Sequence, residues 1–352
     1  MKKSVIKSIF MLSVLLVLTG MITLRECPPA HAATQQYLIK FAHVDPADVY
    51  TSKKHAQGIA FKTLVESKSG GRIKVEIYPA GQLGSEREVL EQTRGGVIQM
   101  TSTGDGPVPG HFKEIMVLGI PYLFKSEPIA WAVFDGPFGR EISEAMRVKT
   151  GLRILAYGET GFRNFTNSKH PIKSPEDVKG LKFRVMDNPM HIQMVKLMGG
   201  YPTPIDWKEV YGALQTKVVD GQENPVSVLI YGKLYEVQKY LTLDGHLYTV
   251  DFIFINDKFY TGLPKDLQKI LKDSAIMAGT VSRGIQQLSS CTGIDTIKSK
   301  GMEIYSPTAE DLVKFRKVVQ EPITEMIRKE VGKEWVDKLL KAVSNAEAEL
   351  DK

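Results

Sequence analysis

Segments with the apolar spacing of β-strands and of α-helices alternate along the chain from about residue 37 onward. Residues 72–78 alternate apolar and polar side chains with the period of a half-buried strand, whereas residues 56–65 carry apolar side chains at helical spacing. Ser85 and Glu88 have the spacing of a capping box, which predicts the start of a further helix. This order predicts an α/β fold in which helices cover parallel or mixed sheets. The strands predicted for this part are residues 37–44, 72–78, 97–101 and 152–157.

A second block of the same kind starts near Gly161. It is predicted to contain a strand at 182–185, a helix at 189–198 and a long strand at 247–255, and the chain becomes mostly helical after Pro264. A chain of 352 residues is long for one ordinary core, and no loose linker separates the two blocks. We therefore predict two α/β lobes joined by strands that cross between them as a hinge. The predicted boundaries are residues 33–160 with about 250–290 for lobe I, and residues 161–249 with about 291–352 for lobe II.

The N-terminus has the pattern of an export signal. Lys2, Lys3 and Lys7 precede an apolar run at residues 9–24, and Ala30-His31-Ala32 supplies the small-x-small pattern of a cleavage site. The alternative is a transmembrane anchor, but the run is shorter than the ~20 residues that a spanning helix needs. We therefore predict a signal peptide at residues 1–32 and a periplasmic or otherwise extracytoplasmic protein.

Removal of this segment changes the charge and the cysteine content. The formal net charge falls from +6 to +3, because four basic residues and one acidic residue are lost. Cys291 is then the single cysteine, so no disulfide can form within the mature chain. Since no histidine lies near it in sequence, we predict that Cys291 is a small buried apolar residue.

Motifs for catalysis, metals and cofactors are missing from the sequence. The glycine-rich stretch 104–110 does not have the spacing of a phosphate-binding loop, and two prolines in it remove amide donors. Basic residues are spread evenly, which argues against nucleic-acid binding. The histidines are scattered without metal-ligand spacing, so neither a metal nor a cofactor is predicted. These histidines are His43, His55, His111, His170, His191 and His246.

Polar residues gather between Gly161 and Pro225, where predicted strands end. Arg163 and Arg184 lie in apolar strand signals, where a guanidinium is costly unless it is paired. A structural ion pair would explain either arginine. The segment 220–225 is interpreted as a tight polar turn after a helix at 209–216.

Several motifs in this stretch resemble solute-binding proteins of tripartite ATP-independent periplasmic (TRAP) transporters of the DctP type. The resemblance covers nearly the whole mature chain and is most specific in the middle. The motifs are Gly161-Phe162-Arg163, the run from Lys173 to Val185, Glu209 to Thr216, Val219 to Pro225, Pro79 to Gly84 and Leu118 to Phe124.

The resemblance implies a two-lobed periplasmic-binding-protein-like (type II) fold with mixed sheets flanked by helices, hinge strands and a long connecting helix. The lobes would close over one small organic acid and deliver it to the small and large membrane subunits of the transporter. By the same resemblance Arg184 would clamp the carboxylate, Arg163 would be a second arginine, Asn224 would hold the carboxylate through its amide, and Trp207 would pack on the ligand. A homodimer is left open.

The first lobe offers candidates on position alone. They are His43, Asp45 and Asp105 at the end of the turn from Thr103, with His246, Tyr248 and Asp251 as weaker ones near the crossing strand.

The chain departs from the family pattern in ways that bear on the ligand. Residues 156–160 replace a Trp-Asp pair that many members carry, and Asp105 would repel a second carboxylate. A C4-dicarboxylate and a monocarboxylate with a hydroxyl, keto or amino group therefore both stay open. Two other functions are considered: a secreted enzyme using Asp105, Glu159 or Asp251, and a protein that presents its ligand to a sensor kinase or chemoreceptor. The absence of a paired catalytic constellation argues against the enzyme.

Overall fold

The computed structural model describes residues 36–350, and the chain from Tyr37 onward forms one compact unit. The predicted signal peptide lies outside the described residues. Within the described part, every helix is too short or too polar to cross a bilayer.

The first sheet is mixed and has five strands in the order β2-β1-β3-β10-β4. Strands β1, β2 and β3 are parallel, because helices α2 (Lys53–Lys68) and α3 (Glu86–Gly95) connect them as crossovers. Strand β10 is antiparallel to both of its neighbours. The strand bounds are β1 Tyr37–Ala42, β2 Ile73–Tyr78, β3 Met100–Gly104, β4 Leu152–Tyr157 and β10 Asp251–Asn256.

The second sheet has six strands in the order β11-β9-β5-β8-β6-β7. Strand β8 lies at its centre, antiparallel to β5 and parallel to β6. The strand bounds are β5 Gly161–Asn167, β6 Lys182–Val185, β7 Tyr201–Pro204, β8 Gly221–Asn224, β9 Tyr240–Thr249 and β11 Glu303–Tyr305.

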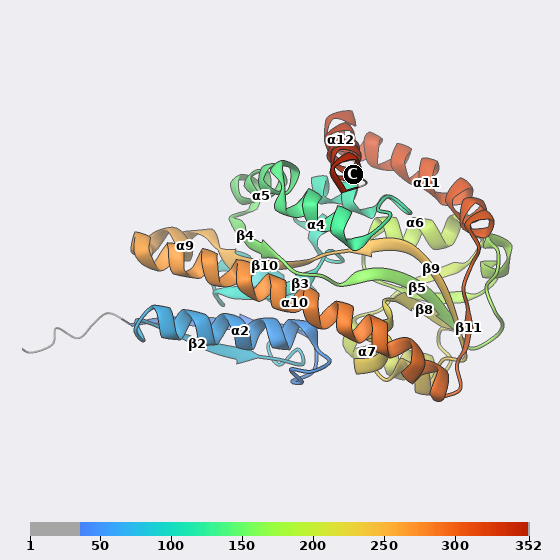
Figure 1. Cartoon of the computed structure of the whole chain (residues 1–352), viewed down its shortest axis with the longest axis horizontal. Helices are drawn as coiled ribbons and strands as arrows, with labels where there is room; N and C mark the ends of the chain where they lie inside the picture. The colour runs from blue at the N-terminus through green and yellow to red at the C-terminus, as the bar shows by residue number, and fades with distance from the viewer. Residues whose placement is uncertain (1–35, 351–352) are drawn as a thin grey trace, which may run out of the picture. The chain divides into compact units, whose positions relative to one another are not determined.

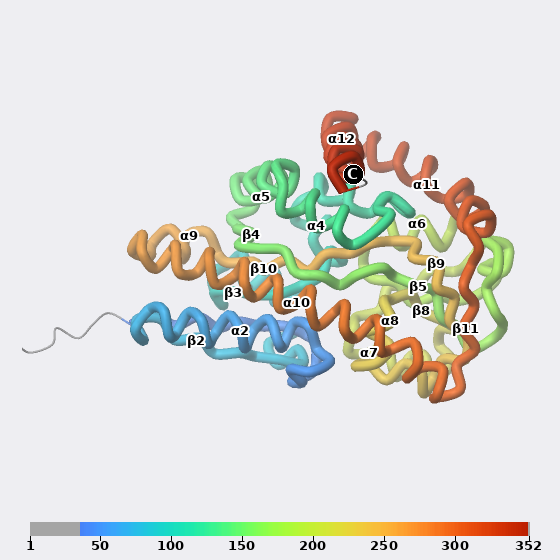
Figure 2. The backbone as a smooth tube through the Cα atoms, viewed as in Figure 1, coloured from blue at the N-terminus to red at the C-terminus, as the bar shows by residue number. Residues whose placement is uncertain are grey.

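Two adjacent passages carry the chain between the sheets (Figure 1). Residues 158–160 join β4 to β5, and Val250 joins β9 to β10. The passages are hydrogen-bonded to each other, since the Thr160 amide donates to the Thr249 carbonyl at 3.1 Å. Figure 2 shows the green and orange passages running side by side. These strands and the long helix α10 (Lys265–Ser299), which packs against α2 and α8 (Val226–Tyr231), confirm the predicted two-lobed α/β fold.

The remaining helices cover the sheets and bury separate apolar cores. Phe41, Phe61 and Leu271 belong to a core between the first sheet, α2 and α10. A larger core includes Phe165 and Phe183 of the second sheet together with residues of the C-terminal helices. These C-terminal helices, α11 and α12, pack against α4, α5 and α6. The bounds are α4 Glu127–Asp135, α5 Pro137–Thr150, α6 Pro189–Leu197, α7 Trp207–Gln215, α9 Asp257–Gly262, α11 Ala309–Val331, α12 Lys333–Leu350, and the 3-10 turns η1 Val108–Gly110, η2 Lys113–Gly119, η3 Pro175–Val178 and η4 Leu234–Glu236.

Capping signals in the sequence locate helix starts well. Ser85, Ser174 and Thr308 each form a capping box with the acidic residue three positions later. At the other end of α3, Gly96 adopts the left-handed conformation that suits glycine after a helix.

Several local predictions are wrong. The strand predicted at 97–101 begins only at Met100, and the long strand predicted at 247–255 is two strands that belong to different sheets. The segment interpreted as a polar turn contains the central strand β8. Cys291 is exposed rather than buried, because it lies on the outer face of α10.

Candidate functional site

A cavity that is open to solvent is lined by residues that belong to both sheets and their helices. A second cavity shares five lining residues with it, so the two are neighbouring parts of one recess. The first cavity is lined by Val44, Asp45, Lys53, Lys54, Glu86, Gly104, Asp105, Thr160, Arg163, Arg184, Met186, Trp207, Asn224, Val228 and Tyr231.

Arg184 is a buried cation without a carboxylate partner. It lies on β6, is 4% exposed and lines both cavities. Its Nε donates to the Ile205 carbonyl at 2.9 Å, and among the described residues no carboxylate lies within ion-pair distance of its guanidinium. Burial and the nearby charge of Arg163 lower the pKa of Arg184 to about 10, so it stays cationic at neutral pH. The site therefore holds one uncompensated positive charge.

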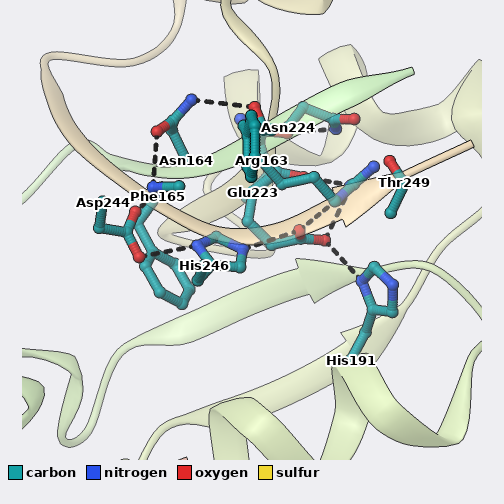
Figure 3. A network of polar contacts seen from close by, with 12 residues as sticks. Arg163, Asn164, Phe165, His191, Glu223, Asn224, Asp244, His246 and Thr249 are labelled. Atoms are coloured by element: carbon teal, nitrogen blue, oxygen red, sulfur yellow. Dashed lines mark hydrogen bonds and ion pairs between the residues drawn. The ribbon is translucent and has the colours of Figure 1, made fainter. Parts of the chain in front are cut away.

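Arg163, by contrast, has its charge balanced inside the protein (Figure 3). Its Nε pairs with a carboxylate oxygen of Glu223, and its Nη2 donates to the other carboxylate oxygen at 2.9 Å. Both side chains are almost fully buried, at 1% and 0% exposure. The ion pair that the sequence offered as an explanation of Arg163 is thus present, and Arg163 also lines the cavity.

Glu223 is the centre of a buried network that the sequence did not reveal. His191 Nδ1 and His246 Nε2 each lie 3.2 Å from one of its oxygens. Burial alone would raise its pKa, but Arg163 and the two histidines lower the pKa of Glu223 well below the usual range. The second nitrogen of His246 lies 2.8 Å from Asp244. Burial would lower the pKa of His246, yet Asp244 and Glu223 raise it to about 9.

The network is tied to the backbone of β5. An Asp244 oxygen accepts from the Phe165 amide at 3.2 Å, and the Phe165 ring stacks on His246 with 4.3 Å between centroids. The register of β5 against β9 shifts between Arg163 and Phe165, which makes room for this acidic residue. Arg163 is thereby held in one orientation at the wall of the cavity.

Asn224 and Trp207 also line the cavity. Asn224 ends β8, next to the Arg163–Glu223 pair, and its amide donates to Gln222 at 2.6 Å. Trp207 is the first residue of α7 and packs edge-to-face on Tyr231 with centroids 5.7 Å apart. A Cβ at Gly232 would lie 2.7 Å from the indole, so glycine is needed there for this packing.

The wall of the cavity on the side of the first sheet carries a compact charge cluster that was not predicted from the sequence. Lys53 lies 3.2 Å from Asp251 and 3.6 Å from Asp45. Lys54 lies 2.6 Å from Glu86, 3.4 Å from Asp251 and 3.7 Å from Asp45. Both lysines are buried at the first turn of α2, where a lysine is normally solvated. The cluster therefore holds two lysines and three carboxylates, and both lysines have carboxylate partners within it.

Of the first-lobe candidates Asp105 and His43, only Asp105 lines the cavity. Asp105 follows β3 and lines the cavity at 3% exposure, and its Oδ1 has no hydrogen-bond partner within residues 36–350. Burial raises its pKa, against the opposing effects of His191 and Arg163. His43 is buried but does not line the cavity; its Nε2 lies 3.2 Å from His55 Nδ1.

The three weaker candidates do not line either cavity. Asp251 pairs with the lysines, His246 belongs to the Glu223 network, and Tyr248 packs against Phe162 with centroids 5.2 Å apart. In the part of the chain that the structure describes, no group of three His, Cys, Asp or Glu side chains is arranged to hold a metal ion.

Comparison with known proteins gives consistent matches over most of the chain. Residues 41–330 match the family model of DctP, bacterial extracellular solute-binding protein, family 7. A solute-binding protein of Verminephrobacter eiseniae is 36% identical over 299 residues, which are 84% of this chain and 88% of that protein. The C4-dicarboxylate-binding periplasmic protein DctP of Rhodobacter capsulatus is 30% identical over 87% of this chain and 90% of its own.

A solved structure extends the match to three dimensions. A TRAP periplasmic solute binding protein from Polaromonas sp. JS666, bound to D-erythronate, superposes with a TM-score of 0.82 at 33% identity. The match covers 87% of this chain and 98% of that one.

Proposed function

Because the chain belongs to family 7 of the bacterial extracellular solute-binding proteins, the DctP-type proteins of TRAP transporters, we propose that it captures its ligand through Arg184. The protein is a TRAP solute-binding protein for small organic acids that acts outside the cytoplasm, and it is not an enzyme. The proposal concerns how the acid is held and passed on: the acid pairs with Arg184, the lobes close over it, and the closed form delivers it to the membrane subunits.

The observation that carries the proposal is the uncompensated charge of Arg184. A buried guanidinium without an ion pair costs free energy in the empty protein, and a ligand carboxylate removes that cost on binding. The two terminal nitrogens of the Arg184 guanidinium match the two oxygens of a carboxylate, and each charge-assisted hydrogen bond contributes about 1.5–3 kcal/mol. A lysine cannot reproduce this geometry.

The neighbouring residues complete the proposed clamp. Arg163 has its Nε and Nη2 committed to Glu223, which leaves Nη1 for a ligand oxygen. Asn224 offers its amide beside it, and the half-buried indole of Trp207 provides an apolar surface for the carbon chain. Glu223 positions Arg163 and does not itself line the cavity.

Closure is supported by contacts that join the two halves beside the second cavity. Arg87, at the start of α3, forms an ion pair with Asp187, which follows β6. Lys208 on α7 donates to the carbonyl of Gly81 near the end of β2. Such contacts exist only when the halves are together, so a ligand that bridges them shifts the population to the closed state.

A thermal-shift comparison tests the proposal. Organic acids at millimolar concentration should raise the melting temperature of the protein, since they bind only its folded state. The uncharged amides of the same acids should leave the melting temperature unchanged. Equal stabilisation by acid and amide would contradict a carboxylate clamp.

A further inference from the structure

Most of the charged groups around the first cavity have a partner of opposite charge. Its lining contains four cations, which are Arg184 and the three residues Arg163, Lys53 and Lys54. Arg163 is paired with Glu223, and the two lysines are paired with acids of the first-sheet wall. Within the described part of the chain, Arg184 is thus the cavity cation that is left without a carboxylate partner.

Among the acids around the cavity, one carboxylate likewise has no cationic partner within ion-pair distance. Asp45, Glu86 and Asp251 are each within 3.7 Å of a lysine nitrogen. Asp105 has no such partner among residues 36–350, and its buried Oδ1 accepts no hydrogen bond there. It stands on the first-sheet wall, whereas Arg184 belongs to the second sheet. A buried polar atom without a partner is costly, so Oδ1 is an acceptor in need of a donor.

We propose, on the basis of the function proposed above, that the ligand is a monocarboxylate with hydroxyl groups, its carboxylate on Arg184 and a hydroxyl donating to Asp105. One free cation accommodates one carboxylate. A second carboxylate on the ligand would face Asp105 on the first-sheet wall, where the two lysines are already outnumbered by Asp45, Glu86 and Asp251. Like charges in a buried site repel strongly because the surrounding dielectric constant is low. Hydroxyl groups instead supply the donor that Asp105 lacks.

The environment of Asp105 supports this assignment. Burial raises its pKa, while His191 of α6 and Arg163 of β5 oppose the rise and Glu223 of β8 adds to it. A ligand hydroxyl would favour the ionised form, whereas a second carboxylate would raise the pKa further. A dicarboxylate would therefore bind only with uptake of a proton, and its affinity would increase as the pH falls.

Calorimetry with matched acids tests the inference. The probes are aldonates of four, five and six carbons (erythronate, xylonate, galactonate), the aldarates of the same lengths (tartrate, xylarate, galactarate) and the unsubstituted acids (butyrate, pentanoate, hexanoate). At pH 7.5 at least one aldonate should bind more than tenfold more tightly than both acids of its length. If an aldarate or an unsubstituted acid binds as tightly, the inference is wrong and organic-acid capture stands. If none of the nine binds, organic-acid capture itself is contradicted and the inference falls with it.

Asp105→Asn separates the role of this residue from a general loss of folding. The variant should bind the preferred aldonate about tenfold more weakly, because an acceptor with full charge is lost, and should bind the matching aldarate more tightly. Opposite changes for two ligands cannot come from misfolding. Asp273→Asn, on α10 with a side chain that is 47% exposed, is the control and should keep the wild-type ratio. An unchanged ratio in Asp105→Asn would overturn the proposed contact.

Discussion

The same substitution at two buried arginines of one cavity should have very different effects on the stability of the ligand-free protein. Arg163→Met removes the partner of Glu223, which is fully buried, whereas Arg184→Met removes a cation that has no carboxylate partner within residues 36–350. In the ligand-free protein, the first change should be strongly destabilising and the second close to neutral. Comparison of the two variants therefore tests whether Arg184 binds a ligand and has no structural partner in the empty protein.

The magnitudes follow from the contacts. Breaking a buried ion pair by removing one partner costs about 3–5 kcal/mol. With an unfolding entropy of about 2.1 cal/mol/K per residue, a protein of this size loses roughly 1.5 °C of melting temperature per kcal/mol, so Arg163→Met should melt about 5–7 °C lower. Arg184→Met removes one hydrogen bond to Ile205, which is unfavourable, and it also removes the free-energy cost of burying a charge, which is favourable. These two effects offset each other to within about 1 kcal/mol.

Thermal and urea unfolding of extensively dialysed protein, followed by circular dichroism, measures both effects. Neither variant should bind an organic acid with wild-type affinity. If Arg184→Met lowered the melting temperature of the empty protein as much as Arg163→Met, Arg184 would have a structural partner and the reasoning would be refuted.

Three further predictions follow from the same contacts. Arg184→Lys should weaken binding of the preferred aldonate about 10- to 100-fold in calorimetry, with the empty protein melting as before; wild-type affinity would contradict a bidentate clamp. Arg87→Ala and Lys208→Ala should each speed ligand dissociation in stopped-flow fluorescence, because each loses a contact across the recess, and unchanged rates would exclude these contacts from closure. His246, with its pKa raised to about 9, stabilises the fold below about pH 6.5 and loses that contribution as the pH rises through 9. Urea unfolding should show this decline in the wild type and a flatter profile in His246→Gln; identical profiles would remove His246 as its source.

The period of the apolar pattern was enough to predict the layers of the fold. Strands β2, β4 and β6 lie within one residue of their predicted limits, because each is bounded by a turn or cap with a clear signal. The split at Val250 could not be predicted. Residues 247–255 are apolar except for Thr249 and Asp251, and the change from one sheet to the other depends on which strands they pair with.

Strand β8 shows why polar composition misled the prediction. Its residues Gly221 to Asn224 read as a turn, yet they are buried at the centre of the sheet. The charge of Glu223 is tolerated there because Arg163 and two histidines, distant in sequence, surround it. An arginine in an apolar strand did signal that a partner exists, but nothing in the sequence says which residue it is.

The lysines of the first-sheet wall could not have been found from the sequence. Lys53 and Lys54 stand side by side at the start of a helix, which is an ordinary solvated position. They are buried because acids from β10, from the first residue of α3 and from the loop after β1 converge on them. Arg184 and Asn224 were accessible through the resemblance, since they lie in its most specific motifs, and Trp207 stands two residues before another of them.

The central claim is that the carboxylate of an organic acid binds the guanidinium of Arg184. A crystal structure of the protein with the tightest-binding acid of the nine tests it most directly. The account predicts both carboxylate oxygens within about 3 Å of the Arg184 terminal nitrogens, inside the cavity that Asp105 and Trp207 also line. A bound acid whose carboxylate contacts the Lys53–Lys54 wall or lies outside this cavity, with Arg184 still unpaired, would contradict it.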